Sequence, residues 1–138
     1  MKTWLYIIFL FGGNFLLAQV RFTVEVPKQD LEVGQQFQIT YRMNRQGSSF
    51  EPPSFSGFIY EGGPVTGINS SIGTNGATIT FSYTYYLKAA TPGKFPLEPA
   101  YAKISGKLYR TEAKEITVVE PKQISTGGKD DQLFLKSY

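Results

Sequence analysis

Apolar and polar residues alternate along most of the chain downstream of residue 18. The alternation covers residues 21–26 and 36–43, and it is longest over residues 77–89. Successive side chains of a β-strand point to opposite faces, so each stretch predicts a strand with one buried face. In the longest stretch the residues that share the predicted buried face are Ala77, Ile79, Phe81, Tyr83, Tyr85, Leu87 and Ala89. Phe81 and Tyr83 are predicted to be core residues of a central strand.

The strand over residues 77–89 is flanked by signals for a bend and for a turn. It is longer than the usual strand of about five or six residues, which predicts a bend or bulge near Tyr85 and Tyr86. Asn75-Gly76 precedes it, and both residue types tolerate the positive φ of a tight hairpin turn. The predicted partner strand in this hairpin is residues 65–72.

Shorter strands are predicted on both sides of this hairpin. Pro27 and Gly34 lie in the connection between the first two alternating stretches, and Leu31 and Val33 are predicted to be tucked under this connection. A second turn is predicted at residues 91–94. The short strands predicted downstream cover residues 94–97, 101–105, 108–111 and 115–119, with a hairpin turn at residues 105–107.

The spacing of these elements predicts an all-β fold. About seven to nine short antiparallel strands, separated by turns every eight to twelve residues or so, are typical of an immunoglobulin-like two-sheet β-sandwich. A closed β-barrel is the alternative. The chain contains no cysteine, so it cannot form the disulfide of an antibody-type domain, and only the architecture would be shared.

The N-terminal segment has the organisation of an export signal. A short positive start precedes an apolar run over residues 4–11, and Ala18 supplies a small residue before Gln19. Residues 1–18 are therefore predicted to be a signal peptide that is cleaved after Ala18. As a helix, residues 4–18 would reach only about 22 Å, short of the roughly 30 Å hydrocarbon core of a bilayer. A retained membrane anchor is the less favoured alternative.

The rest of the chain is predicted to comprise one complete domain and the start of another. The immunoglobulin-like domain is assigned to residues 19–120, and the polar, glycine-containing residues 121–131 are interpreted as a linker. Alternation resumes over residues 132–138, which we interpret as the first strand of a further, truncated β domain. On this interpretation the chain is the N-terminal piece of a longer protein, and it would be membrane-anchored only if that protein carries a later span.

The composition restricts the chemistry of the chain. None of the 138 residues is histidine or cysteine, which excludes disulfides and the zinc and haem sites that use these ligands. The 14 basic and 11 acidic residues leave a small positive charge spread along the chain, unlike the basic patch of a nucleic-acid-binding protein. The sequence therefore predicts no enzymatic activity, no catalytic or metal-ligating residue, no cofactor, no nucleic-acid partner and no small-molecule substrate.

Residues 50–64 form the most unusual segment, since it contains three phenylalanines among three prolines and three glycines and shows no strand pattern. It is interpreted as a stiff, irregular crossover that covers one edge or end of the sandwich. The alternative is a partner-binding surface, because apolar residues on a loop are more suggestive of binding than apolar residues in a core. The candidate partner-binding residues are Pro52, Pro53, Phe55, Phe58, Gly63 and Pro64.

Several short motifs follow the export signal along the chain. They are Phe22-Thr23-Val24, Val33-Gly34-Gln35, Pro52-Pro53-Ser54-Phe55, Gly57-Phe58, Gly63-Pro64, Asn75-Gly76, Tyr83-Thr84-Tyr85-Tyr86-Leu87, Gly93-Lys94-Phe95 and Gly106-Lys107-Leu108-Tyr109. Taken in this order, they resemble the N-terminal region of the BatD-type oxygen-tolerance proteins. The resemblance implies a bacterial envelope protein with tandem β domains outside the cytoplasmic membrane. It also implies protein partners, namely von Willebrand type A domain membrane proteins and a MoxR-type ATPase system. The family offers no catalytic residues.

Two functions follow from the sequence and the resemblance. The favoured one is a non-enzymatic interaction or scaffolding domain of a protein complex in the periplasm or cell envelope, linked to aerotolerance. The alternative is a secreted carbohydrate-binding module, which needs two or three coplanar exposed aromatic rings. The candidate rings are Tyr60, Tyr86, Tyr101 and Tyr109.

Overall fold

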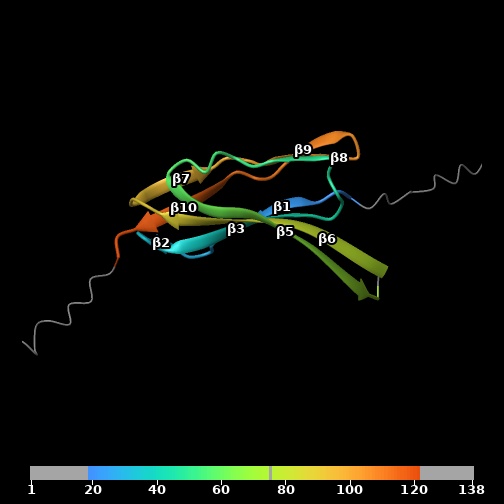
Figure 1. Cartoon of the computed structure of the whole chain (residues 1–138), viewed down its shortest axis with the longest axis horizontal. Helices are drawn as coiled ribbons and strands as arrows, with labels where there is room; N and C mark the ends of the chain where they lie inside the picture. The colour runs from blue at the N-terminus through green and yellow to red at the C-terminus, as the bar shows by residue number, and fades with distance from the viewer. Residues whose placement is uncertain (1–18, 75, 122–138) are drawn as a thin grey trace, which may run out of the picture.

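A computed structural model describes residues 19–74 and 76–121 of the chain (Figure 1). All the regular structure in these ranges is β-strand, which confirms the predicted all-β class. The strands are β1 (Phe22–Glu25), β2 (Leu31–Glu32), β3 (Gln36–Met43), β4 (Ser49–Glu51), β5 (Phe58–Gly73), β6 (Gly76–Ala89), β7 (Gly93–Leu97), β8 (Tyr101–Ile104), β9 (Lys107–Arg110) and β10 (Lys114–Val119). The four short strands predicted near the C-terminal side correspond to β7 to β10.

The strands form a two-layer sandwich rather than a closed barrel. One layer is a four-stranded antiparallel sheet in the order β1-β3-β6-β5. Two three-stranded sheets, β2-β10-β7 and β4-β8-β9, lie together over one side of it (Figure 1). As predicted, β6 is a central strand of the larger sheet, between β3 and β5.

The prediction that all strands pair antiparallel is wrong at β2. This short strand runs parallel to β10, with Leu31 opposite Val118. Both side chains are buried in the core, and the Val33 amide donates a hydrogen bond to the Val119 carbonyl over 3.1 Å. The connection between β1 and β3 therefore crosses to the other layer, because burial of Leu31 there removes its side chain from water.

The core is divided between the two smaller sheets. Under β2-β10-β7 the four-stranded sheet contributes Phe37, Ile39, Tyr41, Tyr85, Leu87 and Ala89, which pack against Leu31, Leu97, Ala100, Ile116 and Val118. Under β8, Met43 packs against Ala102 and Ile104. Phe81 and Tyr83 are half-buried and contact this second cluster. The inward alternation predicted for residues 36–43 is observed in full.

The predicted irregular crossover is shorter than expected. Only residues 52–57 are irregular, because the segment from Phe58 onward belongs to β5. The bulge that was predicted near Tyr86 is present, but it lies in the partner strand. The register of β5 against β6 shifts on both sides of Gly62, which is paired with Tyr86. Pro64 lies in the same irregular stretch, where the absence of a backbone donor is tolerated.

Beyond the bulge, β5 and β6 form a long hairpin that projects past the other strands, at the lower right of Figure 1. The register is regular from Val65 to Gly73, which is paired with Gly76. Gly76 has a φ of 103°, as the predicted tight turn requires, whereas Asn75 lies outside the described residues. The turn prediction is confirmed as far as the described residues reach.

The predicted burial of one whole face of residues 77–89 is wrong for its first part. Ala77 is exposed and Ile79 is 46 % exposed, while the same face is half-buried at Phe81 and fully buried at Leu87. The reason is the extent of the opposite layer, which covers β6 only from Phe81 onward. The alternation in the sequence predicted the strand correctly, but it could not show where the opposite layer stops covering that strand.

Several sequence predictions fall on residues outside the described ranges. They are the signal peptide over residues 1–18, the linker after residue 121 and the strand over residues 132–138. Within residues 19–74 and 76–121, no helix is long and apolar enough to cross a membrane.

Candidate interaction surfaces

The crossover between β4 and β5 turns its aromatic residues inward. Phe55 has a φ of 54°, in the left-handed region, and only 8 % of the residue is exposed. Its ring centroid lies 5.0 Å from that of Tyr85. Phe58 is half-buried, with ring centroids 5.1 Å from Phe37 and 5.2 Å from Phe95. Both rings therefore close one end of the sandwich, and the exposed side chains of the crossover are those of Ser54 and Ser56.

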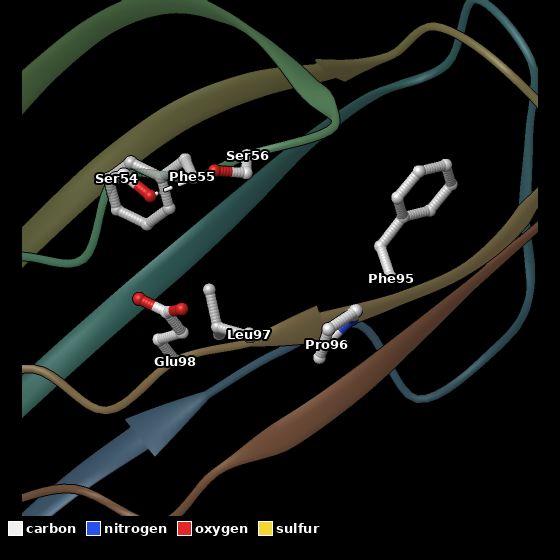
Figure 2. A pocket seen from close by; sticks show the side chains of 7 residues that line it. All are labelled: Ser54, Phe55, Ser56, Phe95, Pro96, Leu97 and Glu98. Carbon is white, nitrogen blue, oxygen red and sulfur yellow. Dashed lines mark hydrogen bonds between the residues drawn. The ribbon is translucent and has the colours of Figure 1, made fainter.

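A shallow cleft separates the crossover from β7 (Figure 2). Ser54, Phe55 and Ser56 line one side, and the side chains of residues 95–98 line the other. The Oγ atoms of Ser54 and Ser56 are 2.9 Å apart and share a hydrogen bond. The cleft volume of about 230 Å³ is below the roughly 300–1,000 Å³ typical of small-molecule sites. A cleft of this size fits a single side chain of a partner better than a metabolite.

The crossover is held against β7 by a close approach at Gly57. This residue has a φ of 93°, and a Cβ built on it would lie 2.4 Å from the Cδ1 atom of Phe95. A side chain of any size at this position would displace the Phe95 ring. Glycine at position 57 therefore sets the width of the cleft, because the wall formed by Phe95 depends on it.

The six candidate partner-binding residues fall into two groups. Pro52, Pro53, Phe55 and Phe58 lie on or next to the crossover, where none is fully exposed. Gly63 and Pro64 are exposed and lie in the irregular stretch of β5, joined by a cis peptide bond. The hydroxyl of Tyr60 donates a hydrogen bond to the Gly63 carbonyl. Both groups lie close to Tyr85, whose ring contacts Phe55 and whose Cα lies 3.1 Å from the position of a Cβ on Gly63.

The four tyrosines considered for carbohydrate binding do not share a platform. Tyr60 lies on β5 and Tyr86 on β6, and they occupy different register positions, since Tyr60 is paired with Leu87. Tyr101 and Tyr109 belong to the β8-β9 sheet, where Tyr109 is paired with buried Ala102 and Tyr101 with Arg110. Neighbouring positions on a strand face opposite sides, so Tyr101 and Tyr109 point to opposite faces. Rings distributed in this way do not form a coplanar surface for a sugar.

The ionisable groups with shifted pKa values belong to the core. Burial, and then the neighbouring Tyr85, raises the pKa of Tyr41. Burial, followed by Tyr60 and Tyr83, raises the pKa of Tyr85 to about 12. Among the described residues the Tyr41 hydroxyl has no hydrogen-bond partner, and no three acidic side chains gather where they could hold a metal ion. The shifts follow from desolvation of two core phenols rather than from an arrangement for proton transfer.

The comparison with known families agrees with the extent of the sandwich. The family model described as the BatD DUF11-like domain matches residues 24–118, from within β1 to within β10. The chain belongs to the BatD family. Neither a curated protein nor a solved structure gives a significant match. The resemblance stated from the sequence is therefore confirmed for most of the chain.

Three exposed isoleucines lie on the β5-β6 hairpin of this BatD domain. Ile68, Ile72 and Ile79 are 74 %, 90 % and 46 % exposed. Ile68 is paired with Phe81 and Ile72 with Ala77, so all of them occupy the face that is buried further along β6. We call these three isoleucines the hairpin face. Sequence reasoning missed this surface, although one signal was available: no charged residue occurs from residue 62 to residue 87.

Proposed function

We propose that this BatD domain is a non-enzymatic interaction or scaffolding domain, and that its main contact surface is the hairpin face. The observation that carries the proposal is the exposure of Ile68, Ile72 and Ile79 on the face that forms the core elsewhere in the same sheet. Exposed apolar patches of this kind mark sites of association, because their burial removes ordered water at an interface. The surface has no evident role inside the domain.

The geometry of the hairpin supports this role. A continuous ladder of paired residues joins Val65–Gly73 to Gly76–Thr84 in the first part of β6, and the later part of β6 is anchored in the core at Leu87. An isolated two-stranded hairpin is only marginally stable, but this one extends a four-stranded sheet. The isoleucines are thereby presented on a preorganised surface, which lowers the conformational entropy lost on binding.

The cellular setting belongs to this proposal and is supported by membership of the BatD family. The domain is exported, acts in the periplasm or cell envelope and contributes to aerotolerance. Its partners are proteins of that compartment, and by resemblance they include von Willebrand type A domain membrane proteins associated with a MoxR-type ATPase. Mass spectrometry of the protein recovered from cells tests the export step, since cleavage after Ala18 leaves a chain that starts at Gln19. Recovery of the intact leader in the membrane fraction would show a retained anchor.

The crossover provides a second contact within the same proposed function. Pro52 and Pro53 restrict the backbone on one side, and Gly63-Pro64 lies at the bulge in β5. Because Phe55 and Phe58 face inward, the part of the crossover that is available to a partner is the cleft, which carries the hydroxyls of Ser54 and Ser56. Their substitution by alanine removes two hydrogen-bonding groups and leaves the buried rings in place.

A crosslinking pull-down from native envelopes tests the proposed function. The bait is the wild-type chain, Ile72→Lys or Leu108→Lys, each at the same folded concentration. Leu108 is a matched control because it is 65 % exposed on β9, a strand at the edge of another sheet. We expect Ile72→Lys to lose envelope partners that wild type and Leu108→Lys recover. Equal recovery by all three baits would exclude the hairpin face, and recovery of nothing by the wild type would contradict the scaffold function.

A further inference from the structure

The hairpin also presents an unprotected sheet edge. β5 is the last strand of its sheet, and from Val65 to Gly73 its register is free of bulges. Proteins usually block such edges with charged residues, bulges or proline, because unpaired backbone groups recruit further strands. The edge strands β1, β7 and β9 of this protein carry Glu25, Lys94, and Lys107 with Arg110. The outer half of β5 carries no charge at all.

We propose that the outer half of β5 pairs antiparallel with the same strand of a second copy of this chain. The two four-stranded sheets would then form one continuous eight-stranded sheet with two-fold symmetry. This inference rests on the proposed interaction function, since it names the partner of the hairpin. The contact is isologous, so each copy contributes the same surface.

The sequence of β5 is self-complementary in one register. When the two-fold axis passes through Ser70, each Ile68 lies opposite the Ile72 of the other copy, and each Gly67 lies opposite Gly73. Ile68 and Ile72 are on the same side of the sheet as Ile79, which is paired with Ser70. Directly opposed β-branched residues stabilise antiparallel pairing, and here the pair occurs twice. The opposed glycines lie on the other face of the sheet, where they place no side chains against each other.

The charge distribution favours a second copy over an unlike partner. The chain carries 14 basic and 11 acidic residues, and a homotypic contact through a charged surface would bring like charges together. Residues 62–87 contain none of these charges, so two copies meet there without repulsion and without desolvating an ion. Recognition of an unlike protein commonly relies on complementary charge for orientation and rate. This surface offers none.

The absence of cysteine from the chain allows a direct test of the register. In the proposed pair the two Ser70 residues face each other, with Cα atoms about 4.5–5.5 Å apart, within the range for a disulfide. The two Thr66 residues would be separated by eight positions along the strands, or about 27 Å. Under mild oxidation we expect Ser70→Cys to form a disulfide-linked dimer and Thr66→Cys, the matched control, to remain monomeric. Equal crosslinking of both variants would contradict the register.

Light scattering of the purified chain over a range of concentrations tests the association itself. We expect a concentration-dependent dimer whose dissociation constant rises at least tenfold in Ile72→Lys and does not change in Leu108→Lys. Ile72 is 90 % exposed, so the melting temperature of the diluted, monomeric protein should be the same in all three. A wild-type chain that stays monomeric throughout would overturn the inference. If that chain still recovers envelope partners through Ile72, the interaction function stands and the second copy alone is excluded.

Discussion

Replacement of Phe55 by alanine separates a packing role from a binding role for the crossover. The side chain of a phenylalanine buries on the order of 150–250 Å², and Phe55 is 8 % exposed. A loss of about 160 Å² of buried apolar area, at about 25 cal/mol/Å², corresponds to about 4 kcal/mol. This value lies within the roughly 3–5 kcal/mol found for Phe→Ala in cores, and it is a large part of the 5–15 kcal/mol or so that stabilises a domain.

Urea denaturation followed by tyrosine fluorescence measures this loss. We expect Phe55→Ala to lower the free energy of unfolding by about 4 kcal/mol, whereas Leu108→Ala, which truncates an exposed apolar side chain, should change it by about 0.5 kcal/mol or less. Any loss of partner binding in Phe55→Ala should follow the loss of folded protein. A change below about 1 kcal/mol would refute the inward placement of the Phe55 ring.

A second substitution at the same position tests the backbone conformation. Phe55 has a φ of 54°, a conformation that costs an L-residue about 1–2 kcal/mol and glycine almost nothing. Glycine in turn loses about 0.5–1 kcal/mol through the flexibility of the unfolded chain. Phe55→Gly should therefore be at least as stable as Phe55→Ala in the same denaturation assay. A clearly less stable glycine variant would argue against the left-handed conformation.

Further predictions concern the cleft wall and the buried phenols. Gly57→Ala should lower the free energy of unfolding by about 1–3 kcal/mol, because its Cβ would lie 2.4 Å from a ring carbon of Phe95 and the φ of this residue is unfavourable for alanine. An unchanged free energy of unfolding in urea denaturation would contradict this geometry. Tyr41→Phe should not destabilise the domain and should raise its melting temperature, because it removes a buried hydroxyl without a partner among the described residues. The domain should also lose stability as the pH rises above about 10. The unfolded tyrosines then release protons while the raised pKa of Tyr85, about 12, keeps the folded form protonated. Thermal melts between pH 8 and pH 11 or so check this, and a flat profile would exclude it.

The sequence was sufficient to predict most of the strands, but it did not show which parts of them are covered by the second layer of the sandwich. Alternation marked β3 and β6 because each has one face in the core for most of its length. The same alternation wrongly assigned Ile79 to the core. A repeat of two residues shows which side chains share a face of the strand, but it does not show whether a second layer covers that face. The parallel pairing of β2 with β10 was missed for a related reason. Two residues are too few to show a pairing direction, which depends here on the burial of Leu31.

The candidate site could be predicted only in part. The richness of residues 50–64 in phenylalanine and proline correctly marked an unusual segment, and composition alone could not decide whether Phe55 and Phe58 face inward or outward. That choice depends on long-range contacts with Tyr85 and with Phe37 and Phe95. The hairpin face could in principle have been predicted from the sequence, because an uncharged stretch as long as residues 62–87 is unusual for a surface segment.

The two ends of the β5-β6 hairpin have separate physical roles, and this separation bears on how the domain can associate without risk to its fold. From Tyr85 to Ala89 alternate side chains are almost fully buried, so substitutions there cost folding free energy. Toward the turn, Ile68, Ile72 and Ile79 keep about half or more of their surface exposed and contribute correspondingly little to the stability of the monomer. Exposed isoleucines on an uncharged sheet edge are a liability for an isolated domain, since they favour further strand pairing. The proposed pairing with a second copy would cover this edge, whereas the edge strands β1, β7 and β9 are already protected by their charged residues.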